Sequence, residues 1–270
     1  MPAAMEVITG FVANVSGFNT PTMNSGDSLT VRYTDPAKKI WLLNAWELTE
    51  GATGQMRIQS PKLHDNVQGI RLRVPQALPN PLLCENAPQR MYPQDNLTWQ
   101  FGGGTGAGAI QPASLLLYYE DLPGVAARFI DEKTLLQRMV NVFTVETAIT
   151  LAATGAYSTA AAINATFDLF KANTDYALLG YLSDQANAAS VHWRGADSGN
   201  LRVGGPAAIN LTHLTAEWFV RLSQNYGIPM IPVFNSAAKQ GIFVDATANH
   251  NAGTLNLVSY MAELAPSPGR

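Results

Sequence analysis

Four histidines are the residues best able to bind a metal or to move protons. They are His64, His192, His213 and His250, which lie far apart with no HxH or HExxH pattern. Metal-binding jelly rolls such as the cupins use two closely spaced histidines with a glutamate on adjacent strands. The spacing therefore predicts no metal ligand, and each histidine is expected on the surface or in a loop. His192, inside an apolar run, is expected to make one hydrogen bond at a contact between subunits.

A glycine-rich segment at residues 102–108 has the composition of a loop that cradles phosphate. It lacks the Lys-Ser/Thr ending of such loops, and Gln111-Pro112 leads into an apolar strand instead of a helix. We therefore predict a flexible connection between two strands and no nucleotide cofactor. Residues 247–253 form a second run of small residues, placed between the last two predicted strands of the chain.

Two acidic pairs, Glu120-Asp121 and Asp131-Glu132, raise the question of glycoside hydrolysis, which needs two carboxylates facing one cleft. Neighbouring side chains of a strand point to opposite faces, so Glu120-Asp121 does not suit that chemistry. Asp131 precedes a stretch typical of a short helix, which it is expected to cap. No catalytic residue is predicted, and the chain is not expected to be an enzyme.

Five tryptophans offer a possible platform for binding sugars: Trp41, Trp46, Trp99, Trp193 and Trp218. Four of them lie in predicted strands and the last on the apolar side of a predicted helix, so core packing is the favoured role. Cys84 is the only cysteine, which excludes an intrachain disulfide and a thiolate metal site. It is expected to be a small buried side chain.

The chain carries unusually little charge. Apolar residues make up 47% and charged residues 14%, against about 25% charged residues in typical soluble domains. Little charge is left to cover the exterior, which indicates that other protein covers much of it. The 17 Lys and Arg residues are scattered and the net charge is −3, so direct, sequence-specific nucleic-acid binding is not expected.

No targeting segment is predicted. The first residues show neither the basic region nor the apolar region of a signal peptide. The longest weakly polar run, residues 148–165, is interrupted by Thr, Tyr, Ser and Asn and falls short of the ~20 apolar residues of a membrane span. We therefore expect a soluble protein that is made in the cytoplasm.

Short apolar or alternating runs, separated by Gly, Pro, Asn and Asp, predict an all-β chain. In the first half, strands are predicted at residues 6–15, 28–33, 39–48, 54–59, 69–74, 90–92, 97–101 and 114–121. In the second half, they are predicted at residues 140–150, 163–170, 175–182, 190–194, 200–203, 230–234, 241–246 and 254–263. Residues 39–46 are apolar on both faces, as a strand covered on both sides would be.

The halves are predicted to be two domains, at residues 1–124 and 138–270. Residues 125–137 form the linker, which ends in the short helix that Asp131 begins. The second domain is expected to hold one further helix, at residues 214–225, which follows the sixth strand. Thr212 is its predicted cap and Gly227 its predicted end, while residues 79–86 are the expected shortened counterpart in the first domain.

An internal repeat connects the two halves. Residues 29–46 lie on residues 165–182 without a gap, so that Val31 meets Phe167, Tyr33 meets Leu169 and Leu42-Leu43 meets Leu178-Leu179. The last strands, residues 115–122 and 257–264, also match, and Leu72-Arg73-Val74 is similar to Leu201-Arg202-Val203. These blocks occur in the same order, which predicts one sandwich folded twice, with about eight strands each.

Two consecutive eight-stranded sandwiches with a helix after the sixth strand resemble the double jelly-roll major capsid proteins of tailless icosahedral phages and adenovirus-like viruses. The resemblance covers nearly the whole chain and rests on architecture and repeat, without a signature motif. It implies a homotrimer with a six-lobed outline, whose barrels stand upright in an icosahedral shell. The implied partners are neighbouring capsomers and minor virion proteins, and in some members of the family an internal membrane vesicle.

The first hypothesis is therefore a structural subunit of a virion shell, made in the host cytoplasm. One alternative is a virion spike or a tail-associated binding module, which a low copy number per particle would indicate. A second alternative is a two-domain jelly-roll protein that binds carbohydrate. Loss of glycan binding after Trp→Ala substitution would indicate the latter.

Overall fold

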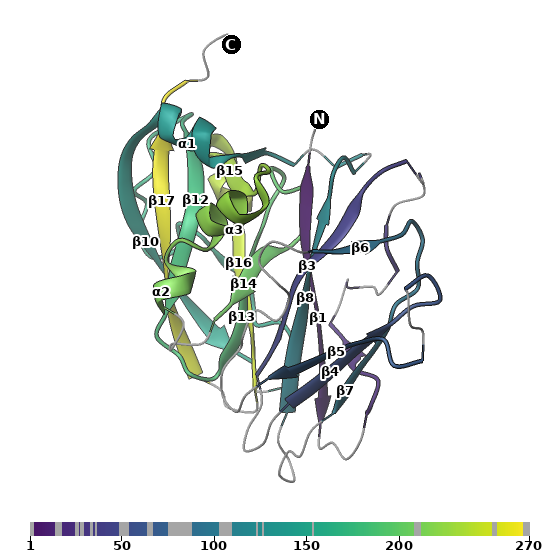
Figure 1. Ribbon diagram of the computed structural model, residues 1–270. Coiled ribbons are helices and arrows are strands. Elements are labelled where there is room, and N and C mark those ends of the chain that lie inside the picture. The colour runs from purple at the N-terminus through teal and green to yellow at the C-terminus, as the bar shows by residue number, and fades with distance from the viewer. Residues whose placement is uncertain are drawn as a thin grey trace.

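The computed structural model describes residues 3–13, 18–24, 27, 30–32, 35, 37–48, 54–63, 67–74, 88–102, 110–122, 124–125, 127–152, 154–207, 212–249 and 253–266. For residues 54, 72–74, 212 and 213 it describes the backbone alone. The described part is mostly antiparallel sheet and forms two sandwiches side by side, the first on the right of Figure 1 and the second on the left. The predicted all-β sandwich fold is confirmed.

The first sandwich contains eight strands: β1 (Ala4–Ala13), β2 (Thr22–Met23), β3 (Ile40–Glu47), β4 (Gly54–Gln59), β5 (Ile70–Val74), β6 (Gln89–Met91), β7 (Thr98–Gly102) and β8 (Ile110–Tyr119). One sheet has the order β2-β1-β8-β3-β6, and the other has the order β5-β4-β7. In addition, Asn19, just before β2, forms an antiparallel bridge with Phe101 of β7.

The second sandwich also has eight strands: β10 (Met139–Leu151), β11 (Ala161–Ala162), β12 (Asp175–Ser183), β13 (Ala188–Arg194), β14 (Val203–Pro206), β15 (Ile231–Asn235), β16 (Phe243–Ala248) and β17 (Gly253–Leu264). Its sheets have the orders β10-β17-β12-β15 and β11-β16-β13-β14. A short strand from the connecting segment, β9 (Phe129–Ile130), pairs with β15 at the edge of the first of these sheets.

The two sandwiches share the connectivity of seven of their eight described strands. With the strands of each half counted from one to eight, one sheet runs 1-8-3-6 in both halves and the other contains 7-4-5 in both. The second strand differs, because β2 pairs with the first strand of its copy and β11 with the seventh. The shared order is that of a jelly roll, an eight-stranded double-sheet fold built from two Greek keys. The predicted repeat is therefore a repeat of strand order.

A β-bulge marks the same place in both copies. Pairing of β3 with β8 shifts between Leu42 and Asn44, and pairing of β12 with β17 shifts between Leu178 and Gly180. The predicted gapless match places Leu42 on Leu178, so the bulges coincide. A bulge inserts one residue and turns the following side chains to the other face. The match of these two strands is thus correct to the residue.

The match is less accurate elsewhere. Leu117 pairs with Leu42, and Met261 pairs with Leu178. Because Leu42 and Leu178 are equivalent, Leu117 and Met261 are equivalent as well. The predicted match of the last strands placed Leu117 on Ser259, two residues away. The two-residue error keeps every side chain on its proper face, because the period of a strand is two.

One predicted strand is wrong. In place of a strand at residues 163–170 the chain forms only the two-residue β11, and Phe167 and Leu169 are 54% and 55% exposed. Val31, which the repeat placed on Phe167, is buried, so the predicted equivalence of these two residues fails. Residues 163–170 alternate in sequence, but alternation alone does not supply a partner strand.

Of the strand predicted at residues 28–33 the structure describes only residues 30–32, where Thr30 forms an antiparallel bridge with Asn96. The other positions of this prediction lie outside the described residues.

The connecting helix, α1 (Glu132–Arg138), begins as predicted, since the Asp131 side chain accepts a hydrogen bond from the Thr134 amide at 2.7 Å. The predicted helix at residues 214–225 is split into α2 (Thr212–Thr215) and α3 (Trp218–Tyr226). Gly227 ends α3 in the left-handed conformation, as predicted. The helices follow the fifth strand of the second sandwich, or the sixth when β9 is counted. The proposed domain limits at 124 and 138 remain a prediction.

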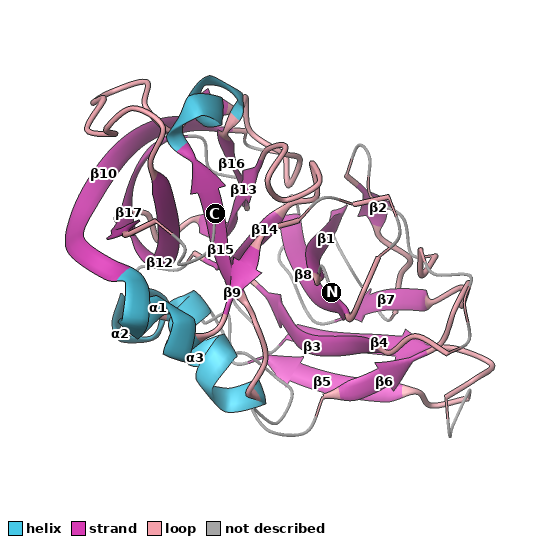
Figure 2. Ribbon diagram, turned by 90° about the horizontal axis from the view of Figure 1, so that it is seen from above, coloured by secondary structure: helices cyan, strands magenta, loops and turns pink. Residues whose placement is uncertain are grey.

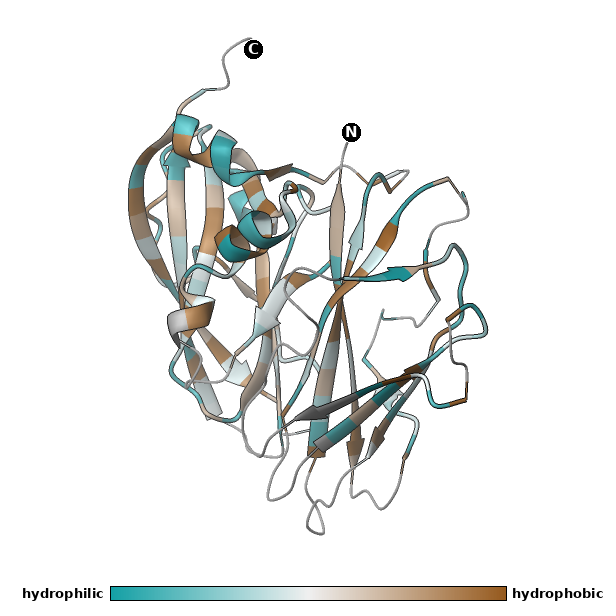
Figure 3. Ribbon diagram, in the orientation of Figure 1, coloured by the Kyte–Doolittle hydropathy of each residue, from teal (hydrophilic) through white to brown (hydrophobic). Residues whose placement is uncertain are grey.

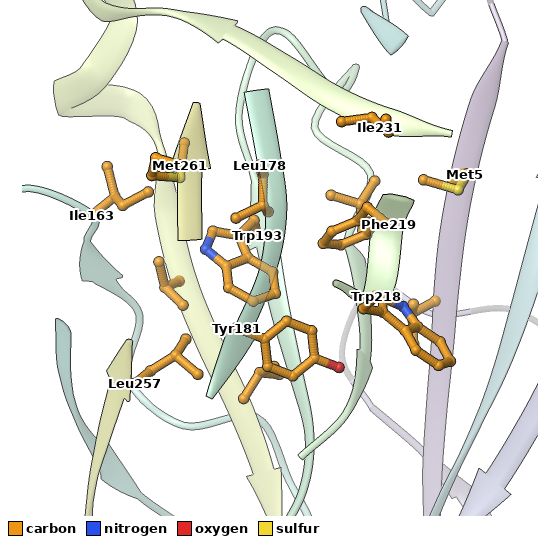
Figure 4. Close-up of a cluster of buried hydrophobic side chains, with 14 of the residues drawn as sticks. Met5, Ile163, Leu178, Tyr181, Trp193, Trp218, Phe219, Ile231, Leu257 and Met261 are labelled. Carbon is orange, nitrogen blue, oxygen red and sulfur yellow. The ribbon is translucent and has the colours of Figure 1, made fainter. Parts of the chain in front are cut away.

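The two sandwiches share a hydrophobic core. Along β1, Ala4 and Ile8 belong to the core of the first sandwich, whereas Met5 and Val7 join the core of the second. Strands β3 and β8 are likewise buried on both faces, which confirms the prediction made for residues 39–46. Figure 4 shows Met5 of the first sandwich pointing toward Phe219 and Trp218 of α3. The sheet β2-β1-β8-β3-β6 is thus the middle layer of the molecule.

Candidate functional site: the polar seam and the exposed apolar surfaces

His192 lies in β13 at the contact between the two sandwiches, and it is fully buried. Its Nδ1 atom is 3.0 Å from Oδ1 of Asp245 on β16. Burial raises the pKa of Asp245, but the hydrogen bond with His192 and the charge of Arg202 outweigh it, so the pKa lies below its usual value. The ionised carboxylate only accepts hydrogen bonds, so the Nδ1 atom carries the hydrogen.

A chain of polar contacts continues from this pair across the seam. Arg202 Nε donates to Asp245 Oδ2 at 3.0 Å, and its guanidinium lies 3.6 Å from the centre of the Tyr157 ring. The Tyr157 hydroxyl donates to Asp27 of the first sandwich, whose carboxylate is also 3.9 Å from Arg202. Burial raises the pKa of Asp27 more than these contacts lower it. We call these five residues the polar seam.

The polar seam does not have the geometry of a catalytic site. A His–Asp pair can activate a hydroxyl nucleophile, but only through the second ring nitrogen. Nε2 of His192 is buried and has no hydrogen-bond partner among the described residues. What the arrangement does is position one sandwich on the other. His192 makes one hydrogen bond, as predicted, but its partner is Asp245 of the same chain, and the general prediction of a surface or loop position is wrong for His192.

The other histidines and loops give little further information. His64 and His250, Cys84 and residues 79–86 and 103–109 lie outside the described residues, as does the side chain of His213. Of the second small-residue run, Thr247 and Ala248 belong to β16. Among the residues that the structure describes, no group of three or more His, Cys, Asp and Glu side chains could hold a metal ion.

The acidic pairs and the tryptophans have structural contacts. Asp121 forms an ion pair with Lys38 at 2.7 Å, and Glu120 accepts a hydrogen bond from the Lys39 amide. The buried tryptophans are Trp46, Trp99, Trp193 and Trp218, with 5% or less of each exposed, and Trp41 packs partly buried against the shared core. Core packing, the favoured role, is confirmed for the four buried tryptophans.

Large apolar side chains remain exposed on the second sandwich. Leu136 of α1 and Met139, Val140 and Val142 of β10 are between 40% and 63% exposed, and we call them the β10 patch. In Figure 2, β10 curves around the outside of the sandwich, and Figure 3 shows its apolar colouring. Contiguous exposed apolar side chains are typical of protein contact surfaces.

A second group of exposed apolar residues lies on the connection between β11 and β12. Phe167 and Leu169 flank Asp168, which forms an ion pair with Lys239 at 2.6 Å. This ion pair holds the connection against the short 3-10 helix at Ser236–Gly241 and leaves the two apolar side chains in solvent. For Phe167 and Leu169 the sequence predicted a place in an apolar strand, whereas both side chains are exposed.

A cleft of about 530 Å³ lies beside the start of β10. Asp175 at its wall accepts hydrogen bonds from Arg128 at 2.7 Å, Arg138 at 3.3 Å and the Asn235 amide at 2.9 Å. Burial raises the pKa of Asp175, but these donors outweigh it and hold the pKa below its usual value. The two arginines come from the connecting segment and α1, so Asp175 fastens both to the second sandwich. Sequence reasoning missed this group, because its members are far apart in the chain.

Two solved structures resemble the chain weakly. The crystal structure of PBSX exported protein XepA gives a TM-score of 0.28 at 6% sequence identity, over 97% of this chain and 86% of that chain. The crystal structure of infectious bursal disease virus VP2 subviral particle gives a TM-score of 0.15 at 10% identity, over 97% of this chain and 67% of that chain. Scores this low support neither a fold nor a function.

No protein-family model matches the chain, and no curated protein matches it in sequence. Within the described residues, no helix has the length and apolar character needed to cross a membrane.

Proposed function

We propose that the protein is a structural subunit of a virion, the major coat protein of an icosahedral shell. The observation that carries the proposal is the jelly-roll connectivity found twice in one chain, with the sandwiches side by side and sharing a core. Three such chains around an axis present six similar lobes, and six-lobed units tile a closed surface. The double jelly-roll coat proteins that the sequence resembles use this design.

The surface properties support a protein that is covered by its own copies. Charged residues make up only 14% of the chain, and most of the described ion pairs join residues of the same sandwich. The β10 patch and the exposed Phe167 and Leu169 offer apolar contact area on the second sandwich. Contacts between coat subunits bury such side chains, whereas a free monomer would leave them in water.

The proposed partners follow from the same surface. They are two further copies in a homotrimer, neighbouring trimers in the shell and minor virion proteins, with an internal membrane vesicle as a further contact in membrane-containing particles. The proposed place is the virion, after synthesis in the host cytoplasm. Neither sequence-specific nucleic-acid binding nor enzymatic activity is part of the proposal.

The test is the assembly state of the purified full-length chain. We expect light scattering after size exclusion to show trimers, and electron micrographs of concentrated samples to show six-lobed units or shells. A chain that stays monomeric at every concentration would overturn the proposal. In purified particles the protein should dominate the protein content, since a low copy number would instead indicate a spike or a tail-associated module.

A further inference from the structure

The first residues of β10 are exposed on both faces. From Val145 onward, β10 alternates between buried and exposed residues, as a strand over a core does. Met139, Val140, Asn141 and Val142, in contrast, are all exposed, and three of the four are apolar. This end of the strand therefore extends past the core of the second sandwich. Its apolar side chains stay in solvent unless another protein surface covers them.

The same segment is a sheet edge. Among the described strands, only β17 pairs with β10, along one side. Figures 1 and 2 both place β10 at the outside of the molecule, with no described element beyond it. The free edge presents backbone N–H and C=O groups that another extended strand can satisfy.

The charge around this edge decides what kind of strand fits. Residues 139–145 carry no charge, and two of the charges beside them are paired: Arg138 with Asp175 at 3.3 Å, and Glu263 with Lys171 at 2.7 Å. A nucleic acid or an anionic lipid surface would find no free cation within this segment. An uncharged, β-branched extended strand is complementary to it.

The chain itself offers that strand in a second copy of β10. The other described edge strands are poor partners: β2, β9 and β11 have two residues and β6 has three. Strand β5 carries Arg71 and Arg73, β7 is bridged by Asn19, and β14 packs against β1. Among the edge strands that the structure describes, β10 alone combines length, exposure and absence of charge in its first residues. An antiparallel pair of identical strands is closed by a two-fold axis.

We propose that two copies of the protein pair through the first residues of β10, antiparallel and centred on Asn141. Val140 of each copy then lies opposite Val142 of the other, and the outer faces of both strands stay aligned, because opposite residues in an antiparallel pair point to the same side. The contact rests on the proposed self-assembly, in which it joins neighbouring trimers. Leu136 extends the contact on the α1 side.

A cysteine at the centre of the pairing tests it. Opposite Cα atoms in an antiparallel pair are about 4.5–5.5 Å apart, which suits a disulfide. Both cysteines are introduced in the Cys84→Ser background. Under mild oxidation, the yield of covalent dimer should be at least about tenfold higher for Asn141→Cys than for Thr150→Cys. Thr150 is an exposed residue at the far end of the same strand, so it is the matched control. Equal crosslinking of the two variants would overturn the pairing.

A charge substitution tests the β10 pairing separately from the proposed coat function. Val140→Lys with Val142→Lys places four cations at the pairing site of two copies, and it should leave trimers intact while shells no longer form. The control, Thr150→Lys, should assemble as the unmodified chain does. If the double variant still forms shells, the pairing is wrong and the coat function stands. If the unmodified chain forms neither trimers nor shells, the coat function itself falls.

Discussion

Glu47, the last residue of β3 in the first sandwich, is fully buried. Gln111 Nε2 donates to its Oε2 atom at 2.9 Å, while Oε1 of Glu47 and Oε1 of Gln111 are buried without a partner among the described residues. Burial raises the pKa of Glu47 to about 8, although the bond from Gln111 opposes the shift. The carboxyl group is therefore mostly protonated at neutral pH.

This pair makes the stability of the first sandwich depend on pH. The folded protein keeps a proton that the unfolded chain releases above its ordinary pKa of 4.5, so the free energy of unfolding falls as the pH rises from about 4.5 through about 8. At about 1.4 kcal/mol per pKa unit, the full loss amounts to several kcal/mol. Glu47→Gln should remove the decline and raise the melting temperature at pH 9.

Thermal melts from pH 5 to pH 9 measure this effect. Glu146→Gln, at an exposed position of β10, is the control and should melt as the unmodified protein does. A Glu47→Gln variant whose melting temperature falls with pH as steeply as that of the unmodified chain would show that the ionisation of Glu47 is not the cause.

The two equivalent bulges both hold helix α3, which packs between the sandwiches. In the first sandwich the carbonyl of the bulge residue Leu43 accepts a hydrogen bond from the Tyr226 hydroxyl at 3.0 Å. In the second, Gly180 lies directly under the junction of α2 and α3, where a Cβ atom would be 2.3 Å from the Ala216 carbonyl oxygen. The missing side chain of Gly180 is thus what lets the helices approach β12.

Gly180→Ala should separate the helices from β12. Overpacking in a dense core costs about 1–3 kcal/mol, and the nearest neighbours of the added group are backbone atoms of Thr215 and Ala216, which cannot rotate away. Chemical denaturation should therefore show reduced stability of that order. Gly253→Ala, at a glycine with no atom within 4 Å of the added group, should change little. Equal stability of both variants would mean that the junction adjusts freely.

At the scale of the whole molecule, the polar seam and the shared core make the two sandwiches one unit. Val7 of β1 donates a backbone hydrogen bond to the Arg202 carbonyl at 2.8 Å, and Trp46 meets Trp218 edge to face at 6.3 Å. Arg202 lies between the carboxylates of Asp27 and Asp245. Such burial across the contact predicts that the sandwiches unfold together.

Arg202→Met should uncouple them. The substitution removes the arginine that lies 3.9 Å from Asp27 and 3.0 Å from Asp245, and the arginine that remains beside Asp245 is Arg194, at 3.5 Å. Breaking a buried ion pair costs about 3–5 kcal/mol. Calorimetry should show a lower melting temperature and two resolved transitions in place of one. Arg221→Met is the control, since Arg221 pairs with Glu217 at 3.7 Å on the exposed side of α3, where an ion pair contributes little. A single transition in Arg202→Met at an unchanged temperature would contradict this role of the seam.

Local patterns predicted much of the architecture. Alternation and turn residues located most strands within a few residues, because each strand buries one face wherever it pairs. The gapless match of two strands even aligned their bulges, although it extended over Phe167 and Leu169, which are exposed. The predictions that Asp131 begins a helix and that Gly227 ends one were correct, because a helix end depends on residues that are neighbours in the chain.

The sequence by itself determined the all-β character, the repeat and the low charge, which are sums of local properties. Only the tertiary structure decided that His192, Asp245, Arg202, Tyr157 and Asp27 meet at one seam, and that the start of β10 extends past its core. Such groups come from segments up to about two hundred residues apart, and their encounter depends on how two sheets stack, which no short-range pattern encodes. The physical reason is that burial is a property of the assembled layers and not of the residue type.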